Sequence, residues 1–405
     1  MNIKSLLLGS AAALVAVTGA RAADVIVPMA EPTEYVRVCD VYGTGFHYIP
    51  GTETCLSING YVRFKYAVAG PVEDSFGNNF VRNAEGDDYQ AGSAVRVRLN
   101  FDAREETELG TLRAFARIQA TNTFGAYSND ESYAMDMGYI QLGGLTMGYL
   151  DSLFTEGDGL LTDTDLPIGD IQTNRVSYTF AAGGLAATVA LEDDGSGDFA
   201  PNVVGKLGYS GGFGSFNLYG VYEESVQFGQ GGFEPFGIGL LNPVVSEDAF
   251  VLKANASFKD IIAADSELKF EGSYAFDPST YSTLGLFNNV RSLGNDINPF
   301  VGAVATEWQV GAGYAQSFGK LGLAVSGVYG ETFDDFTILT APIRTVNAGN
   351  GDYYKLVGNV GYEITNNFDM LAEVSYSSID FNGQNGFVDN DADQTAGFVQ
   401  FVRSF

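Results

Sequence analysis

The chain has 405 residues and a formal net charge of −29, because 50 acidic residues outnumber 21 basic ones. This balance excludes nucleic acid as a partner, since binding to phosphates requires a basic surface. The 51 Gly, 22 Tyr and 30 Phe residues suit short strands, tight turns and aromatic rings at a boundary, whereas one histidine and two cysteines leave little material for a catalytic or metal site.

Residues 1–22 have the pattern of a signal peptide. Lys4 supplies a positive start, residues 6–17 are apolar, and Ala20-Arg21-Ala22 fits the small-x-small cleavage pattern. The apolar run is too short to span a bilayer as a helix. The sequence therefore predicts an exported chain whose mature part begins at residue 23.

Residues 23–56 are expected to form a periplasmic segment ahead of the first strand. They hold Cys39 and Cys55, and an even cysteine count in an exported chain favours a disulfide, which stabilises by roughly 3 kcal/mol in the chain-entropy model. The alternative is a pair of free or metal-binding thiols, although zinc takes four ligands. The lone histidine, His47, precedes the strands, so a Ser–His catalytic pair is not supported. We predict no enzymatic activity, no cofactor and no metal.

From residue 57 onward, apolar and polar residues alternate, which is typical of strands with one apolar and one wet face. In residues 368–376, for example, Asp369, Glu373 and Ser375 separate apolar and aromatic positions. After the leader we find no run of about 18 apolar residues, so no helical span is expected. About sixteen alternating segments follow one another, at 57–68, 93–104, 111–122, 134–142, 145–154, 174–181, 184–192, 203–210, 214–225, 247–258, 266–276, 304–318, 320–333, 351–364, 367–379 and 393–405.

The connections between these segments alternate in length. The long ones are 69–92, 123–133, 155–173, 193–202, 226–246, 277–303, 334–350 and 380–392, and short turns lie between them. Long loops on one rim and short periplasmic turns on the other are the layout of outer-membrane barrels, whereas a soluble sandwich has no reason to sort its loops. The sequence predicts an all-β fold, a transmembrane antiparallel β-barrel over residues 57–405.

Basic residues of the early strands fall on the polar face. A charge on the lipid face near mid-bilayer costs about 2–4 kcal/mol, so we expect these side chains to line the lumen: Arg63, Lys65, Arg96, Arg98, Arg113, Arg117 and Arg175.

The loop 155–173 carries the opposite charge and contains no Lys or Arg. Its acids are Glu156, Asp158, Asp163, Asp165 and Asp170. If this loop folds inward, acids face a basic wall across a narrow pore, and such charges set ion preference. In the alternative, the loop stays outside and the inward bases pair with inward acids such as Asp102.

Three segments resemble the general porins of alphaproteobacteria: YVRVCD at 35–40, FHYIPGTETCL at 46–56 and GYVR at 60–63. The leader end ARAAD at 20–24 and the closing VRSF at 402–405 are similar to that family as well. The resemblance implies a homotrimeric outer-membrane barrel with the loop 155–173 folded inward. Its partners would be outer-membrane lipid and the small hydrophilic solutes and ions that diffuse through it passively.

Three functions fit these observations. The first is a general diffusion porin, with weak cation preference because 50 acids dominate the mouths. The second is a substrate-selective channel of the same fold with a saturable site. The third is a surface adhesin or structural anchor with a plugged barrel, whose long loops 69–92, 226–246 and 277–303 carry binding.

Overall fold

The computed structural model describes residues 37–74, 83, 85–125, 128–165, 171–224, 248–287, 305–333, 337–340, 344–347, 350–382 and 390–405. Its elements are the short helix η1 (Asp40–Tyr42) and the strands β1 (Phe46–Tyr48), β2 (Cys55–Ala69), β3 (Glu73–Asp74), β4 (Gln90–Thr107), β5 (Gly110–Gly125), β6 (Ser128–Leu142), β7 (Leu145–Asp151), β8 (Gln172–Ala182), β9 (Leu185–Glu192), β10 (Asn202–Gly211), β11 (Gly214–Glu223), β12 (Ala249–Lys259), β13 (Ser266–Ala275), β14 (Thr306–Phe318), β15 (Leu321–Thr332), β16 (Thr337–Thr340), β17 (Arg344–Asn347), β18 (Gly351–Thr365), β19 (Phe368–Phe381) and β20 (Asn390–Ser404). No helix among these residues has the length and hydropathy of a membrane span.

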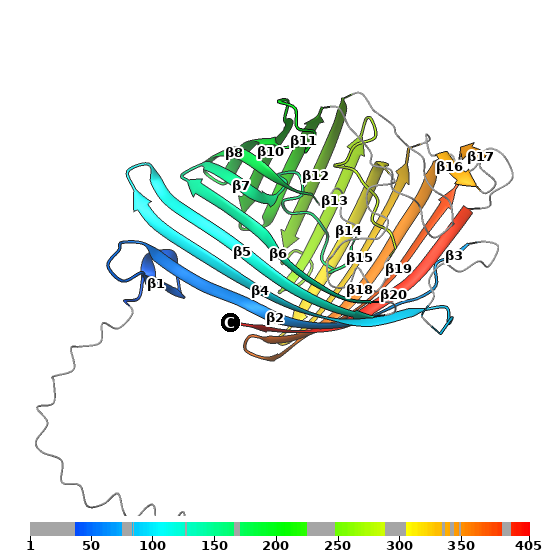
Figure 1. Cartoon of the computed structure of the whole chain (residues 1–405), viewed down its shortest axis with the longest axis horizontal. Coiled ribbons are helices and arrows are strands. Elements are labelled where there is room, and N and C mark those ends of the chain that lie inside the picture. Colours follow the sequence, from blue (N-terminus) through cyan, green and yellow to red (C-terminus); the bar gives the residue numbers. More distant parts are fainter. Residues whose placement is uncertain are drawn as a thin grey trace, which may run out of the picture.

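The strands close into one barrel (Figure 1). Eighteen strands share a sheet; β1 and β3 are short additions to it, and the other sixteen form an antiparallel cylinder. The cylinder closes where β20 pairs with β2, from Tyr61 opposite Ser404 to Ala69 opposite Ala396. β16 and β17 pair only with each other. The predicted barrel is confirmed, and closure gives each of these sixteen strands a paired neighbour on both sides.

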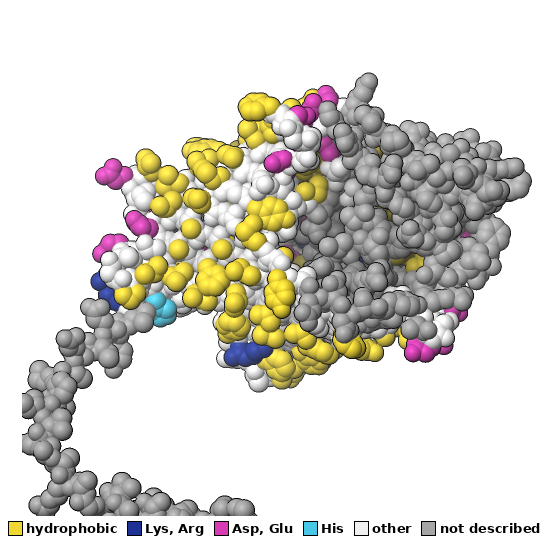
Figure 2. All heavy atoms as spheres, in the orientation of Figure 1, with side chains coloured by type: hydrophobic (Ala, Val, Ile, Leu, Met, Phe, Trp, Pro, Cys, Tyr) yellow, Lys and Arg dark blue, Asp and Glu magenta, His cyan; other side chains and the backbone are white. Residues whose placement is uncertain are grey.

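Alternation along each strand separates a lipid-facing surface from a lumenal one. On β2, Val62, Phe64 and Tyr66 are 43–48% exposed outward, whereas Arg63 and Lys65 between them are buried inside. Figure 2 shows hydrophobic side chains spread over the visible outer wall. At the strand ends, outward tyrosines donate hydrogen bonds to acids: Tyr222 to Asp248, Tyr274 to Glu307 and Tyr329 to Asp352. Such amphipathic rings suit the boundary between lipid and water.

One expected loop is largely strand. Residues 123–133 were predicted to connect two strands, but β5 continues to Gly125 and β6 begins at Ser128, paired in register. The residues of this hairpin are mostly polar and lack the alternation that predicts strands, because a strand that extends beyond the bilayer needs no apolar face. Lower in the hairpin, a β-bulge shifts the register between Arg117 and Ile118. The bulge brings Asp136 within reach of lumenal arginines.

The N-terminal segment packs against the end of the barrel where the short turns lie. Cys39 and Cys55 form a disulfide, as predicted, and both are buried. β1 pairs with the start of β2, and the Tyr42 hydroxyl donates to Glu106 near the β4–β5 turn. The guanidinium of Arg104 lies 5.0 Å from the Phe46 ring centroid. The segment is thereby fixed beside one edge of the lumen.

Candidate pore lining and inward loops

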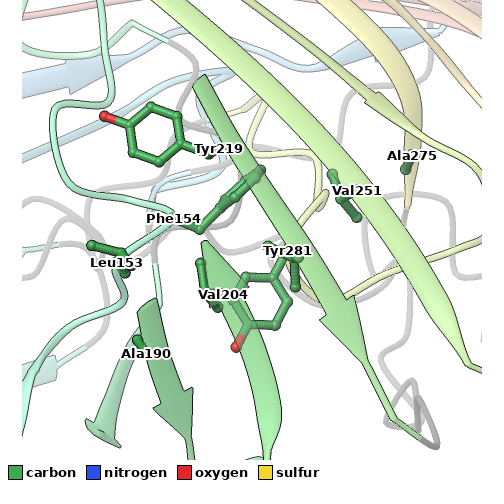
Figure 3. Close-up of a cluster of buried hydrophobic side chains, with 9 residues drawn as sticks. Leu153, Phe154, Ala190, Val204, Tyr219, Val251, Ala275 and Tyr281 are labelled. Atoms are coloured by element: carbon green, nitrogen blue, oxygen red, sulfur yellow. The ribbon is translucent and has the colours of Figure 1, made fainter. Parts of the chain in front are cut away.

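An apolar patch on the lumenal wall explains why a loop enters the barrel. Near the long-loop ends of β9–β13, the inward positions are apolar rather than polar: Ala190, Val204, Val221, Val251 and Ala275. Leu153 and Phe154 from the loop between β7 and β8 cover this patch, together with Tyr281, and all three are at most 2% exposed (Figure 3). Burying a large apolar side chain stabilises by about 1.5–3 kcal/mol. We call residues 152–165 the first inward loop.

A buried carboxylate fixes the root of the first inward loop. Glu192, at the end of β9, is fully buried and accepts hydrogen bonds from the Ser152 hydroxyl (2.8 Å) and the Leu153 amide (2.7 Å). The Tyr281 hydroxyl donates to the same carboxylate at 2.8 Å. An ionised acceptor makes stronger hydrogen bonds than a neutral one, so Glu192 holds the point where the loop turns inward.

Acidic side chains of the loop dock onto bases of the wall. Glu156 pairs with Arg175 on β8 and with Lys206 on β10, the latter at 3.1 Å. Asp158 pairs with the fully buried Lys253 on β12, whose ammonium also donates to the Phe154 carbonyl. These acids therefore neutralise bases in direct contact instead of facing them across water.

The tip of the loop is fixed on the far side of the barrel. Asp163 pairs with Lys65 on β2 at 3.2 Å. Glu373 on β19 accepts the Asp163 and Thr164 amides at 2.7 and 2.8 Å and the Thr164 hydroxyl at 2.6 Å. Asp165 folds back and accepts the Leu160 amide. Burial raises the pKa of the Asp165 carboxyl to about 6.

A second segment, residues 278–287, also enters the lumen. We call it the second inward segment. Glu223 on β11 accepts the Ser279 hydroxyl (2.5 Å) and the Thr280 amide (3.1 Å). The ring of Tyr281 packs edge-on against Phe154, with centroids 5.8 Å apart. Because the Tyr281 hydroxyl also donates to Glu192, the two inward segments are bound by the same carboxylate.

Four arginines on β4 and β5 line a different part of the wall. We call Arg98, Arg104, Arg113 and Arg117 the arginine patch; their side chains are 22–27% exposed. Asp102 accepts paired hydrogen bonds from both Arg104 and Arg113, at 2.7–3.0 Å. Asp136 lies 3.5 Å from Arg98 and 3.3 Å from Arg117. The patch thus holds two more positive than negative groups and remains in contact with lumenal water.

The predicted site residues fall into three groups. Lys65, Arg175, Glu156, Asp158, Asp163 and Asp165 lie where the first inward loop meets the wall, and Arg98, Arg113 and Arg117 lie in the arginine patch. Arg63 and Arg96 are only 7% and 2% exposed, so they present little charge to lumenal water. Asp170 lies outside the described residues.

Sequence reasoning missed Arg104, Lys206, Lys253, Lys269 and Lys355. All five occupy inward positions of the same alternation, so extending the face rule to every strand would have found them. The wall acids Glu192, Glu223 and Glu373 also lie on inward faces, but their loop partners are distant in the sequence.

One group of carboxylates is arranged closely enough to consider for a metal. Ligand atoms of Asp194, Asp198 and Glu224 lie within 4.8 Å of one another at the loop end of the barrel. Asp194 and Asp198 are exposed, and the Asp194 carboxylate accepts the Ser196 amide. Solvated loop acids account for this arrangement.

A closed antiparallel barrel with an apolar exterior, a charged lumen and a loop folded across it defines an outer-membrane channel. Residues 24–400 match the porin subfamily, and the chain belongs to that family. The porin Omp2b of Brucella canis is 33% identical over 441 residues, and that of Brucella neotomae 34%; each alignment covers all of both chains.

Solved structures show the same fold at low sequence identity. The outer membrane channel DcaP of Acinetobacter baumannii has a TM-score of 0.59 and 16% identity, covering 88% of this chain and 99% of that one. An anion-selective porin from Comamonas acidovorans has a TM-score of 0.54 and 11% identity, covering 87% and 100%. The family and its full-length relatives make the chain an outer-membrane diffusion porin, and the solved structures share its fold.

Proposed function

We propose that the first inward loop and the arginine patch bound the narrow part of a water-filled channel for small hydrophilic solutes and ions. One observation carries this proposal. The loop contacts inward residues on β2, on β8 to β13, on β15 and on β19. The side chains of the arginine patch on β4 and β5 stay partly exposed. The passage therefore runs between the docked loop and that wall.

The remaining parts of the proposal concern export, assembly and partners. Residues 1–22 act as a cleaved signal peptide and residues 23–56 as a periplasmic segment, which their composition supports. The barrel inserts in outer-membrane lipid and assembles as a homotrimer. OmpT of Vibrio cholerae, whose structure was solved in a trimer form, shares the fold with a TM-score of 0.50, 11% identity and coverage of 87% of this chain and 100% of that one. The chain is a channel and catalyses no reaction.

Single-channel recording tests this function. The mature chain, purified in detergent and inserted in a planar bilayer, should give stepwise currents that rise linearly with salt and voltage. Vesicles containing it should admit small sugars at rates that fall with sugar size. Rates that saturate for one sugar class would replace the general porin with a selective channel. Absence of any current would leave, as the remaining function, a surface adhesin or structural anchor with a plugged barrel.

A further inference from the structure

The arginine patch includes aromatic rings as well as charge. Phe115 on β5 and Tyr139 on β6 occupy the lumenal row between two pairs of arginines, and their rings stack with centroids 5.1 Å apart. The guanidinium of Arg113 lies 5.1 Å from the Phe115 centroid and 5.3 Å from that of Tyr139. The guanidinium of Arg117 lies 5.6 Å from the Phe115 centroid. Both guanidinium groups therefore converge on one aromatic surface.

The arginines keep hydrogen-bond donors for a ligand. Arg104 and Arg113 use Nε and Nη2 on Asp102, and within the described residues their Nη1 groups neither bond to protein nor are buried. Arg117 donates from Nε to Asn100 and from Nη1 to Asp136. Within the described residues its Nη2 group neither bonds to protein nor is buried. Aspartates thus fix each guanidinium in place and leave donors pointing at lumenal water. Preorganised donors lower the cost of binding.

This combination selects a chemical class. A carboxylate matches the planar guanidinium geometry, and the excess of two positive groups attracts an anion. Phe115 and Tyr139 offer a flat apolar surface on which a ring can lie. Asp102 and Asp136 lie close enough to disfavour multiply charged anions such as phosphate dianions.

We propose that the arginine patch with Phe115 and Tyr139 is a low-affinity binding site for singly charged aromatic carboxylates passing through the pore. The site lies on the part of the wall that the first inward loop leaves partly exposed, so a bound ring narrows the passage. This inference rests on the proposed function, since a solute must enter the lumen to reach the site.

The test uses benzoate as the probe on the full mature protein in a planar bilayer. Benzoate should reduce the single-channel current with a saturating concentration dependence. Acetate, which lacks the ring, and benzyl alcohol, which lacks the charge, should block much less. In R113Q and in F115L the half-blocking benzoate concentration should rise about fivefold, the range expected for losing one ion pair or one ring contact. Asp102 keeps Arg104 in R113Q, so the barrel should fold.

A matched control removes a charge elsewhere. Lys320 lies in the β14–β15 turn, 51% exposed and 3.7 Å from Glu363, so K320Q should leave the benzoate block unchanged. Equal block of wild type, R113Q and F115L, or equal block by acetate and benzoate, would overturn the site while open-channel currents kept the porin function standing. A protein without current in plain salt would instead refute the porin function.

Discussion

Three buried glutamates on the barrel wall use the same arrangement to hold inward segments. Glu192, Glu223 and Glu373 are at most 3% exposed, and each accepts a backbone amide and a Ser or Thr hydroxyl from an incoming loop. A buried carboxylate without partners is very costly. The docked loop supplies hydrogen-bond donors to the glutamate, and the glutamate supplies an acceptor to the loop, so both groups are satisfied only in the docked state. Each glutamate thereby selects the conformation that narrows the lumen.

Replacing Glu373 should release the loop tip. E373A leaves the Asp163 and Thr164 amides without their acceptor, at a cost of about 1–3 kcal/mol for each buried group that stays unpaired. We expect noisier single-channel currents and a lower urea midpoint for unfolding from lipid vesicles. E363Q, at an exposed turn position, serves as the control. Quiet E373A channels of wild-type conductance would show that other contacts alone hold the tip.

Asp165 should make the loop sensitive to pH. Burial raises its pKa from 3.8 to about 6, so the docked loop favours the protonated acid. The hydrogen bonds from the Leu160 and Thr162 amides, and then the charges of Lys269 and Lys355, oppose this shift only in part. For a raised carboxyl pKa, ionisation disfavours the docked state, and the contribution is lost as pH rises through about 6. Current noise should therefore increase between pH 4 and pH 7 in wild type, as the pH passes from the ordinary pKa to the raised one. D165N, which mimics the neutral acid, should stay quiet, and equal pH dependence in both proteins would contradict this role.

At the scale of elements, the two inward segments support each other. Phe154 of the first packs on Tyr281 of the second, and Glu192 binds both. The apolar wall patch beneath them would otherwise face water, so neither segment can leave without exposing it. This coupling makes the loop pair a single cooperative unit.

Truncating Tyr281 should loosen the first inward loop from a distance. Y281F removes only the hydroxyl that donates to Glu192, whereas Y281A also leaves a cavity, costing about 3–5 kcal/mol by analogy with large aromatic truncations. Residues 152–165 contain no Lys or Arg, so a glutamate-specific protease that cleaves after Glu156 reports loop release. Cleavage in micelles should accelerate slightly in Y281F and strongly in Y281A. Identical cleavage rates in wild type, Y281F and Y281A would show that the second inward segment does not stabilise the first inward loop.

The strands could be predicted from the sequence because alternation depends only on neighbouring residues. The same rule placed Arg98, Arg113 and Arg117 on the lumenal face. It could not reveal that Glu156 and Asp158 dock directly on Lys206 and Lys253, since those contacts join residues far apart in the chain.

The second inward segment was missed for a related reason. Val204, Val221 and Val251 break the polar character of the inward face, a signal that something apolar must cover them. The sequence analysis did not use this signal, and the composition of a loop does not show which wall residues it will contact, so Tyr281 was not identified as the cover.

For the whole molecule, the distribution of charge matters more than its sum. The formal charge is −29, yet Glu156, Asp158 and Asp163 of the first inward loop are matched by wall bases, and the arginine patch carries a local positive excess. Most of the uncompensated negative charge therefore belongs to regions outside the narrow part. A permeating ion therefore meets two opposing fields: the acidic mouths attract cations at long range, and the arginine patch attracts anions at short range.

Changing the ionic strength should distinguish the field of the acidic mouths from that of the arginine patch. The screening length is about 10 Å at 0.1 M salt and about 3 Å at 1 M, so the acidic mouths act across the channel entrance only in dilute salt. We expect zero-current potentials in a tenfold KCl gradient to indicate weak cation preference at low salt that vanishes near 1 M. The double variant R98Q/R117Q removes two lumenal positive charges beside Asp136 and should strengthen cation preference at both concentrations. Anion preference at low salt in wild type would mean that the arginine patch, and not the acidic mouths, governs which ions pass.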